Sequence, residues 1–304
     1  MLWQTCLVAH VGVGMASQDS KAVLITGAGG GIGAAAVEAF AARGYRVYAA
    51  VRNVDTAGHL DRANVVRLEL DVTDAGSVRR ALERVAAERA AVGLQVLLNN
   101  AGVIVQGPLE LVPEAELHRQ FDVNVYGPQR VLTAALPLLR AGRGRVINIS
   151  APTARTAMPY LGPISASKAA LESLSKAARV ELAPWGIPVT VVEPGAVETT
   201  IFAKAETNAR KALALTDGDR VELYRNQLAA VDAALAGQKA GPVDGVVKAI
   251  VRAAEARRPK ECYVAGSDAR MLRLLSYLPF RLRDRVLARA LGLARVDLAA
   301  GALR

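Results

Sequence analysis

Short apolar runs alternate with helix-like stretches along most of this chain, and this alternation limits the possible folds most strongly. The runs resemble buried strands, because each is short and ends in glycine or polar residues. In chain order they are KAVLITG, YRVYAAV, NVVRLELDV, LQVLLNNAG, GRVINIS, IPVTVVEPG and ECYVAG. Helical patterns separate most of them, the longest from Pro113 to Arg140. Strands joined by helices predict a parallel sheet covered on both faces.

Right-handed crossovers turn such a sheet into a doubly wound, Rossmann-like α/β fold with three α/β/α layers. A chain of 304 residues fits one large domain, and no linker interrupts residues 21–195. We therefore predict a single domain over 20–304, after a disordered extension over 1–19. A polar helical region near 199–240 is expected to form a substrate lid at the carboxyl edge of the sheet. A helical tail is expected near 268–304.

The cysteines and histidines exclude several kinds of site. Cys6 and Cys262 lie far apart and form no C-x-x-C pair, which favours a reducing compartment. The three histidines are scattered along the chain, so we expect no metal site. The net charge of +10 comes from dispersed basic residues, and aromatic residues make up only 4%. That distribution fits basic surface helices and favours no nucleic-acid partner.

The two ends of the chain bear on location. No basic residue precedes the apolar run at the amino terminus, so a secretory signal is a poor fit, and Met15 is an alternative start. The tail from Met271 to Val296 has leucines at helical spacing with arginines between them. It is either a basic amphipathic helix on an anionic membrane or a helix that closes the substrate pocket. We expect a cytoplasmic protein, with peripheral membrane contact through this tail as one alternative.

The stretch TGAGGGIG, from Thr26 to Gly33, joins the first strand to the first helix. Glycines there let the backbone turn tightly and approach a pyrophosphate, while the helix amino terminus offers free N–H groups. We predict a dinucleotide cradle. Its residues are Gly27, Gly29, Gly31, Ile32 and Gly33.

The ends of the next two strands indicate which dinucleotide is bound. An acidic residue after the second strand would select NAD, but this chain has Val51 and then Arg52. An arginine can pair with a 2′-phosphate, so we predict NADP(H) in preference to NAD(H). Asp71 and Val72 follow the third strand and are candidate adenine contacts. The alternative for Asp71 is a cap on the following helix.

Taken together, these motifs resemble the short-chain dehydrogenase/reductase family. The glycine motif, NNAG, NVYG, SASK and PGAVETT occur in the family's order, over about residues 21 to 266. The resemblance implies an NADP(H)-dependent oxidoreductase acting on a lipophilic alcohol or ketone, and a homodimer or homotetramer formed through helix 162–182. The alternative for that helix is ordinary packing on the sheet. The resemblance adds these cofactor contacts: Asn100, Ala101, Gly102, Lys168, Pro194, Gly195 and Thr199.

The same resemblance exposes a departure at the reacting centre. In the family, a tyrosine four residues before the lysine donates a proton, and a serine after the fifth strand polarises the substrate oxygen. Here Ile164 occupies the tyrosine position and Ala151 the serine position. Ser150 is adjacent to Ala151, but neighbouring strand residues point to opposite faces. The cofactor residues remain, while both oxygen-binding side chains are missing.

Three explanations fit this pattern. The site could be rebuilt around Tyr160, as in relatives that reduce enoyl thioesters and place their tyrosine further upstream. The chain could be an NADP(H)-binding pseudoenzyme that acts through protein partners. A water held by Asn124 and Lys168 could instead supply the proton slowly. Two simpler roles also remain open: Lys168 as a surface lysine, and Asn124 bonded to the backbone of its own helix.

Overall fold

The computed structural model describes residues 20–236 and 240–296, which form a seven-stranded parallel sheet. The expected extension over 1–19 and the end of the tail lie outside the described residues. The strand order is β3-β2-β1-β4-β5-β6-β7, as a doubly wound fold requires. The strands are β1 Ala22–Thr26, β2 Arg46–Val51, β3 Val65–Glu69, β4 Val96–Asn99, β5 Arg145–Ile149, β6 Val189–Pro194 and β7 Cys262–Ala265.

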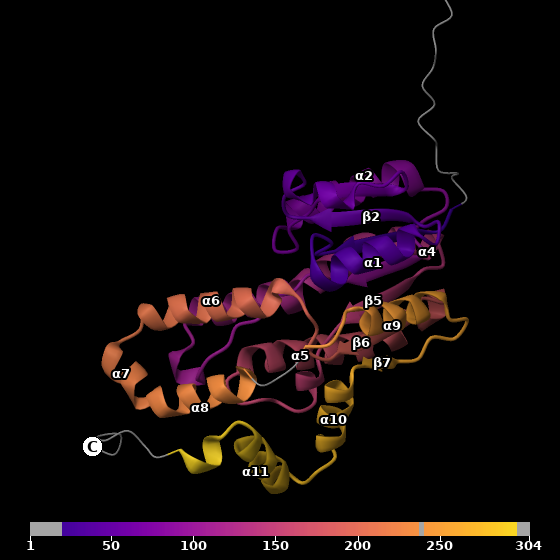
Figure 1. The fold of residues 1–304 in the computed structure, drawn as a ribbon. Helices are drawn as coiled ribbons and strands as arrows, with labels where there is room; N and C mark the ends of the chain where they lie inside the picture. The colour runs from indigo at the N-terminus through magenta and orange to yellow at the C-terminus, as the bar shows by residue number, and fades with distance from the viewer. Residues whose placement is uncertain (1–19, 237–239, 297–304) are drawn as a thin grey trace, which may run out of the picture.

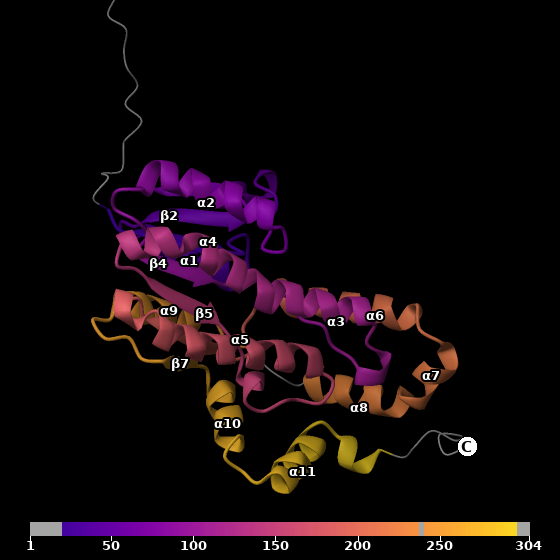
Figure 2. The same ribbon diagram turned by 180° about the vertical axis from the view of Figure 1, so that it is seen from behind.

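Helices cover both faces of this sheet and extend beyond one end of it (Figure 1). Helices α1 and α9 pack on one face, and α2, α4 and α5 on the other, as the reverse view shows (Figure 2). This gives the predicted three layers. The helices are α1 Gly31–Ala41, α2 Ala75–Arg89, α3 Glu114–Phe121, α4 Gly127–Ala141, α5 Gly162–Glu181, α6 Thr200–Ala214, α7 Gly218–Leu223, α8 Arg225–Ala236, α9 Asp244–Glu255, α10 Ser267–Leu275 and α11 Phe280–Ala290.

The core forms because the central strands are apolar on both sides. Every residue of β1 is buried, and alternate residues serve the two layers. Val23 and Ile25 pack towards α1 and α9, whereas Leu24 packs towards α2 and α4. The strand order reverses direction at β1, between its neighbours β2 and β4. Ligands of doubly wound sheets bind in the crevice at such a switch point, outside the carboxyl ends of the strands.

Two helical regions differ from the sequence pattern. The stretch from Pro113 to Arg140 is not a uniform helix, because a π-helical segment, η3 (Asp122–Tyr126), separates α3 from α4. The tail is likewise broken into α10 and α11, with Pro279 at the start of α11. The region expected to form a lid contains three helices, α6 to α8, which extend beyond the sheet (Figure 1).

Candidate cofactor and active site

The turn between β1 and α1 leaves no room for a side chain at Gly27, Gly31 or Gly33. Gly27 and Gly31 have φ angles of +64° and +53°, which favour glycine. A Cβ on Gly33 would lie 2.2 Å from the Gly27 carbonyl oxygen. The Asn100 side chain donates hydrogen bonds to the carbonyls of Thr26 and Gly27, both at 3.0 Å. The NNAG motif after β4 therefore stabilises the glycine turn directly.

Unused polar groups border this turn, and they fit a phosphate-bearing ligand. Gly30 precedes α1 in an extended conformation, and no side chain caps the helix. Next to the turn lies Thr199, whose Cγ2 is 2.8 Å from the position a Gly31 Cβ would take. The Thr199 hydroxyl is buried with no hydrogen-bond partner among the described residues. A free helix terminus and an unsatisfied hydroxyl beside a turn without side chains suit a dinucleotide pyrophosphate.

The groups expected to bind the adenosine half lie at the ends of β2 and β3. Arg52 is exposed directly after β2. The Asp71 carboxylate accepts hydrogen bonds from the amide and hydroxyl of Thr73, at 2.8 and 2.7 Å. The cap of α2 is Asp74, which accepts from the Gly76 amide, so the capping alternative for Asp71 is wrong. Val72 is buried near Gly127.

Asn124 lies in the π-helical segment and is fully buried. Its side chain accepts from the Val103 amide at 2.9 Å and donates to the Val103 carbonyl at 3.0 Å. It also donates to the Ser167 hydroxyl at 3.4 Å. These partners lie on the loop after β4 and on α5, so the alternative of bonding within its own helix is wrong. The π-helical segment turns Asn124 towards the loop that carries Ala101 and Gly102.

Lys168 on α5 is buried, so the surface alternative for this lysine is wrong. Its Nζ donates to the Ile149 carbonyl at 2.7 Å. A Cβ on Gly102 would lie 3.8 Å from that Nζ, which places the ammonium beside the NNAG loop. Burial lowers the pKa of Lys168 to about 8, although the nearby Glu172 carboxylate opposes the shift. The ammonium has donors left for a ligand hydroxyl.

The burial of Lys168 gives a testable pH dependence. Its pKa is about 8 in the folded chain, against 10.5 for an unperturbed lysine. Between these values the unfolded chain still holds a proton that the folded chain has lost, so stability rises with pH. Without cofactor, the free energy of unfolding of the wild type should therefore rise by about 3 kcal/mol across this window, relative to Lys168→Met.

Denaturant unfolding at a series of pH values measures this difference. Lys176→Met is the matched control, because Lys176 is exposed on the same helix. Its difference from the wild type should stay flat with pH. A flat difference for Lys168→Met as well would contradict the buried, depressed lysine.

Positions 164 and 151, where the family has its tyrosine and serine, carry no acidic proton in this chain. Ile164 is buried one helical turn before Lys168. Ala151 follows β5 and is partly exposed. The neighbouring Ser150 is buried and donates to Glu172 at 2.8 Å, so its hydroxyl is already used.

Tyr160 has a different environment from the one a catalytic tyrosine needs. Its hydroxyl donates to Gln227 of the lid helix α8 at 2.6 Å. Its φ of +65° is unusual for a residue with a side chain. Burial raises its pKa, and Tyr224 adds to the shift. The structure therefore connects Tyr160 with the lid.

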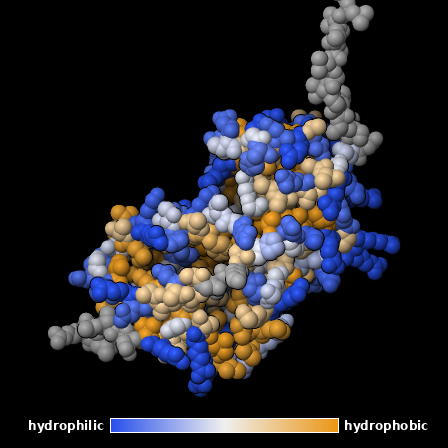
Figure 3. Space-filling model, in the orientation of Figure 1, coloured by the Kyte–Doolittle hydropathy of each residue, from blue (hydrophilic) through white to orange (hydrophobic). Residues whose placement is uncertain are grey.

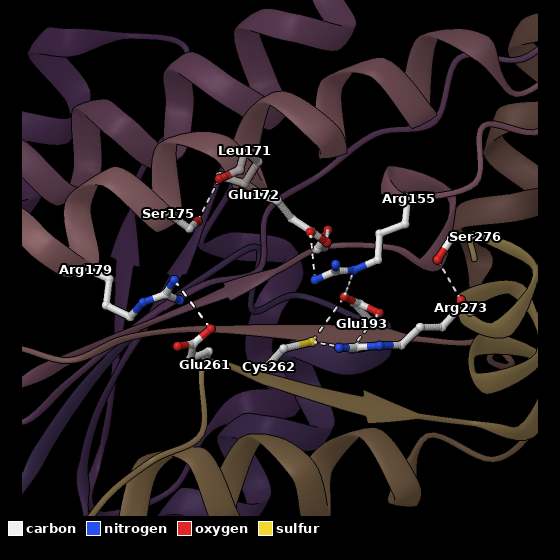
Figure 4. Close-up of polar contacts among 11 residues, drawn as sticks. Arg155, Leu171, Glu172, Ser175, Arg179, Glu193, Glu261, Cys262, Arg273 and Ser276 are labelled. Carbon is white, nitrogen blue, oxygen red and sulfur yellow. Dashed lines mark hydrogen bonds and ion pairs between the residues drawn. The ribbon is translucent and has the colours of Figure 1, made fainter. Parts of the chain in front are cut away.

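A network of charged side chains surrounds the buried carboxylates Glu172 and Glu193, and sequence reasoning missed it (Figure 4). Arg155 forms ion pairs with Glu172 of α5 at 3.4 Å and with Glu193 of β6 at 2.9 Å. Glu193 also accepts from the Cys262 thiol at 3.1 Å and lies 3.6 Å from Arg273 of α10. Burial and the bond to Glu193 raise the pKa of Cys262 to about 11, so the thiol stays protonated. The network joins the loop after β5 to β6, β7 and α10.

Two sequence signals could have pointed to this network. Glu172 follows Lys168 by four residues, which places both on one face of α5. Glu193 lies in a mostly apolar buried strand, and buried carboxylates require partners. A third missed group is Thr153, in the turn after Ala151, whose buried hydroxyl has no partner among the described residues. It is an additional polar group next to Ala151.

A mostly apolar cleft lies between α6 and the loop after β4. It begins at Ile104, one residue beyond the Asn124 contacts, and reaches Ala205 and Leu213 of α6. The segment after α6 is joined to the same loop, because Arg220 and Tyr224 contact Glu110. Within residues 20–236 and 240–296 no His, Cys, Asp and Glu side chains gather as a metal site would need, and no helix is long and apolar enough to cross a membrane.

The chain is similar to known proteins over most of its length. The short chain dehydrogenase family matches residues 21–210. A NADPH-dependent 3-dehydrocapnine reductase of Ornithobacterium rhinotracheale is 34% identical over 273 residues, covering 86% of this chain and 94% of its own. The 11-beta-hydroxysteroid dehydrogenase type 2 of Oryctolagus cuniculus is 33% identical, covering 88% of this chain and 70% of its own.

A solved structure is similar to this chain as well. A short chain dehydrogenase of Burkholderia cenocepacia J2315 in complex with NADP superposes with a TM-score of 0.70, at 27% identity over 89% of this chain and 98% of its own. The parallel sheet, the glycine turn at its switch point and the buried lysine beside the NNAG loop are thus accompanied by similarity over most of the chain. The protein belongs to the short-chain dehydrogenase/reductase family and is an oxidoreductase of the type that uses a nicotinamide cofactor.

Proposed function

We propose that the protein transfers hydride between NADP(H) and a lipophilic alcohol, ketone or enoyl compound, at an atypical active site. The observation that carries the proposal is the buried Lys168 beside the NNAG loop, with Ile164 one helical turn before it. When bound, the nicotinamide ring supplies or accepts the hydride. Lys168 would hold a ribose hydroxyl, and Asn124 fixes the loop that adjoins it. The substrate oxygen meets no acid at positions 151 and 164, so chemistry is expected to be slow.

The preference for NADP(H) rests on Arg52 and on the absence of an acid beside it. An exposed arginine after β2 can reach a 2′-phosphate, whereas a carboxylate there would repel one. Asp71 bonds Thr73 through Oδ1 alone, which leaves Oδ2 for the proposed adenine contact. The NADPH-dependent relative and the NADP complex of the Burkholderia protein support this preference.

Arg52→Ala is expected to weaken NADPH binding about 10- to 100-fold and to leave NADH binding nearly unchanged. A charge-assisted pair with phosphate is worth about 1.5–3 kcal/mol, and NADH has no 2′-phosphate. Fluorescence titration with both cofactors measures the two Kd values. Arg79→Ala, an exposed arginine of α2, is the control and should change neither. Equal losses for both cofactors would exclude Arg52 as the phosphate contact, and no binding of either would overturn the proposed function.

The substrate class rests on the apolar cleft under the lid. Its lining is mostly apolar, which suits a lipophilic molecule. The similarity to a hydroxysteroid dehydrogenase favours the same class. Following NADPH absorbance in a screen of lipophilic ketones and enoyl thioesters tests this assignment.

A second candidate is an NADP(H)-binding pseudoenzyme that acts through protein partners. The Tyr160 contact with Gln227 favours it, because that tyrosine is held by the lid. Binding of NADPH without turnover of any screened substrate would support this candidate.

The oligomeric state and location are proposals that rest on the resemblance. We propose a homodimer or homotetramer formed through α5, whose outer face exposes Leu174 and Val180. A cytoplasmic location is proposed as well.

A further inference from the structure

The C-terminal helices present an apolar surface that nothing in the described structure covers. We define the tail surface as the exposed large apolar side chains of residues 271–282. Figure 3 shows hydrophobic residues gathered at the lower edge of the molecule, where Figure 1 places α10 and α11. The members are Met271 (59% exposed), Leu274 (69%), Tyr277 (75%), Phe280 (74%) and Leu282 (47%). Five large apolar side chains exposed within twelve residues mark an interaction site.

The charge around the tail surface is strongly positive. Residues 267–296 contain seven arginines and two aspartates, and no lysine or glutamate. One aspartate, Asp268, is already used, because it accepts from the Ala196 amide at 2.6 Å. Arg270, Arg281, Arg285 and Arg289 are all exposed. The partner of this surface therefore has to be apolar at its centre and negatively charged around it.

The tail is fixed to the domain, so the surface is preformed. Arg273 contacts Cys262 at 3.1 Å, and Thr156 donates to the Leu272 carbonyl at 3.0 Å. Ala269 and Leu287 point inward and are buried. The same helices thus use one set of residues for packing and leave another set outside. The exposed apolar set is not needed to attach the tail.

We propose that the tail surface binds an anionic lipid bilayer. Aromatic and aliphatic side chains of a helix lying in the membrane plane enter the boundary between headgroups and acyl chains, while its arginines pair with lipid phosphates. Each basic residue near an anionic leaflet adds about fivefold to the affinity, since its attraction is about 1 kcal/mol. The combination of apolar and basic groups supplies the two signals that stable peripheral binding requires.

A second copy of the chain fits this surface less well. A two-fold dimer would place the tail surface against itself, so the arginines of one copy would meet those of the other. Phe280 illustrates the conflict, because Arg283 already lies over its ring at 4.6 Å. Phosphate headgroups relieve this repulsion, whereas an identical copy increases it.

Vesicle flotation with the full chain tests the proposal. The wild type should float with vesicles of phosphatidylcholine containing about a third phosphatidylglycerol, and much less with phosphatidylcholine alone. Salt at about 1 M should release most of it. Failure to bind the anionic vesicles at low salt overturns the proposal. NADPH titration is independent of this result, so a failure here leaves the proposed redox function intact.

Paired variants test whether vesicle binding depends on the tail surface itself or on exposed apolar and basic residues anywhere on the protein. Tyr277→Ser/Phe280→Ser and Arg281→Gln/Arg285→Gln/Arg289→Gln should each weaken binding at least tenfold, and the triple variant about a hundredfold. The first control is Leu109→Ser/Leu215→Ser, since these side chains are 70% and 89% exposed elsewhere. The second is Arg79→Gln/Arg80→Gln/Arg84→Gln on α2, at the far end of the molecule (Figure 1).

Both control variants should float like the wild type, and all variants should keep the wild-type NADPH affinity and melting temperature. Equal losses in the controls would overturn a specific tail surface. Sedimentation analysis tests whether a second copy of the chain binds the tail surface instead. A dimer that Tyr277→Ser/Phe280→Ser converts to monomer, in a chain that does not float, would assign the surface to a second copy and overturn the proposal.

Discussion

The double variant Ala151→Ser/Ile164→Tyr is expected to raise NADPH-dependent ketone turnover about 10²- to 10⁴-fold. A positioned general acid contributes about that factor, and the two changes supply both an acid and a group that polarises the oxygen. Residues 164 and 168 lie on the same face of α5, one turn apart. A tyrosine at 164 would therefore place its ring next to the ammonium that the chain has kept.

The state of Lys168 makes this gain plausible near neutral pH. With a pKa of about 8, the lysine is largely protonated at pH 7. A cation within a few ångströms lowers the pKa of a tyrosine from about 10 towards the working range. Ala151 is partly exposed, so a serine there adds one hydroxyl without crowding. The larger change is at Ile164, which is buried, and some loss of stability is expected there.

Turnover by each variant is measured from NADPH absorbance on the same ketone series. The matched control is Ala151→Ser/Ile164→Phe, which adds the ring but not the hydroxyl and should show no comparable gain. A double variant that binds NADPH normally and shows no gain over this control would contradict the assignment of positions 151 and 164. Tyr160→Phe in the wild-type background addresses the rebuilt site: loss of a measurable wild-type rate would make Tyr160 the donor.

The glycine turn was predictable because its signals are local. A glycine turn between a buried strand and a helix is defined by a few consecutive residues, and the structure places Gly31 and Gly33 in that turn. The doubly wound sheet follows from strand and helix order alone, and both family and fold are confirmed. NNAG was predicted as a cofactor contact. Its further role in holding the turn, through Asn100, depends on β1 and β4 being neighbours.

The surroundings of Lys168 and Tyr160 depend on contacts between segments that are distant in sequence. Arg155, Glu193 and Arg273 meet only because β5, β6 and α10 come together, and no spacing along the chain encodes that. The contact of Tyr160 with Gln227 likewise depends on how the lid returns over the domain. A tyrosine near a lysine in sequence was an ambiguous signal. The positive φ at Tyr160 and its raised pKa became visible only with the tertiary structure.

Gly33→Ala is expected to remove cofactor binding almost completely and to lower stability. The new Cβ would lie 2.2 Å from the Gly27 carbonyl oxygen and 2.7 Å from the Asn100 side-chain nitrogen. Both neighbours are fixed, since Asn100 holds the Gly27 carbonyl by a hydrogen bond. Helix α1 must therefore move away from the turn, which opens the cradle. Overpacking of this kind costs about 1–3 kcal/mol in stability, and we expect NADPH affinity to fall about a hundredfold or more.

Gly30→Ala is the matched control within the same turn. Nothing lies within 4 Å of the position its Cβ would take, and its φ of −175° is ordinary extended backbone. This variant should lose only about 1 kcal/mol of stability, because alanine is a poorer N-cap than glycine, and should keep an NADPH Kd within about threefold of the wild type. Calorimetry and fluorescence titration of both variants give the comparison. If both variants lose NADPH affinity equally, the close approach of Gly33 to Gly27 is not what maintains the cradle. If only Gly33→Ala loses NADPH affinity, the packing of α1 against the turn that Asn100 holds is what permits a dinucleotide to bind.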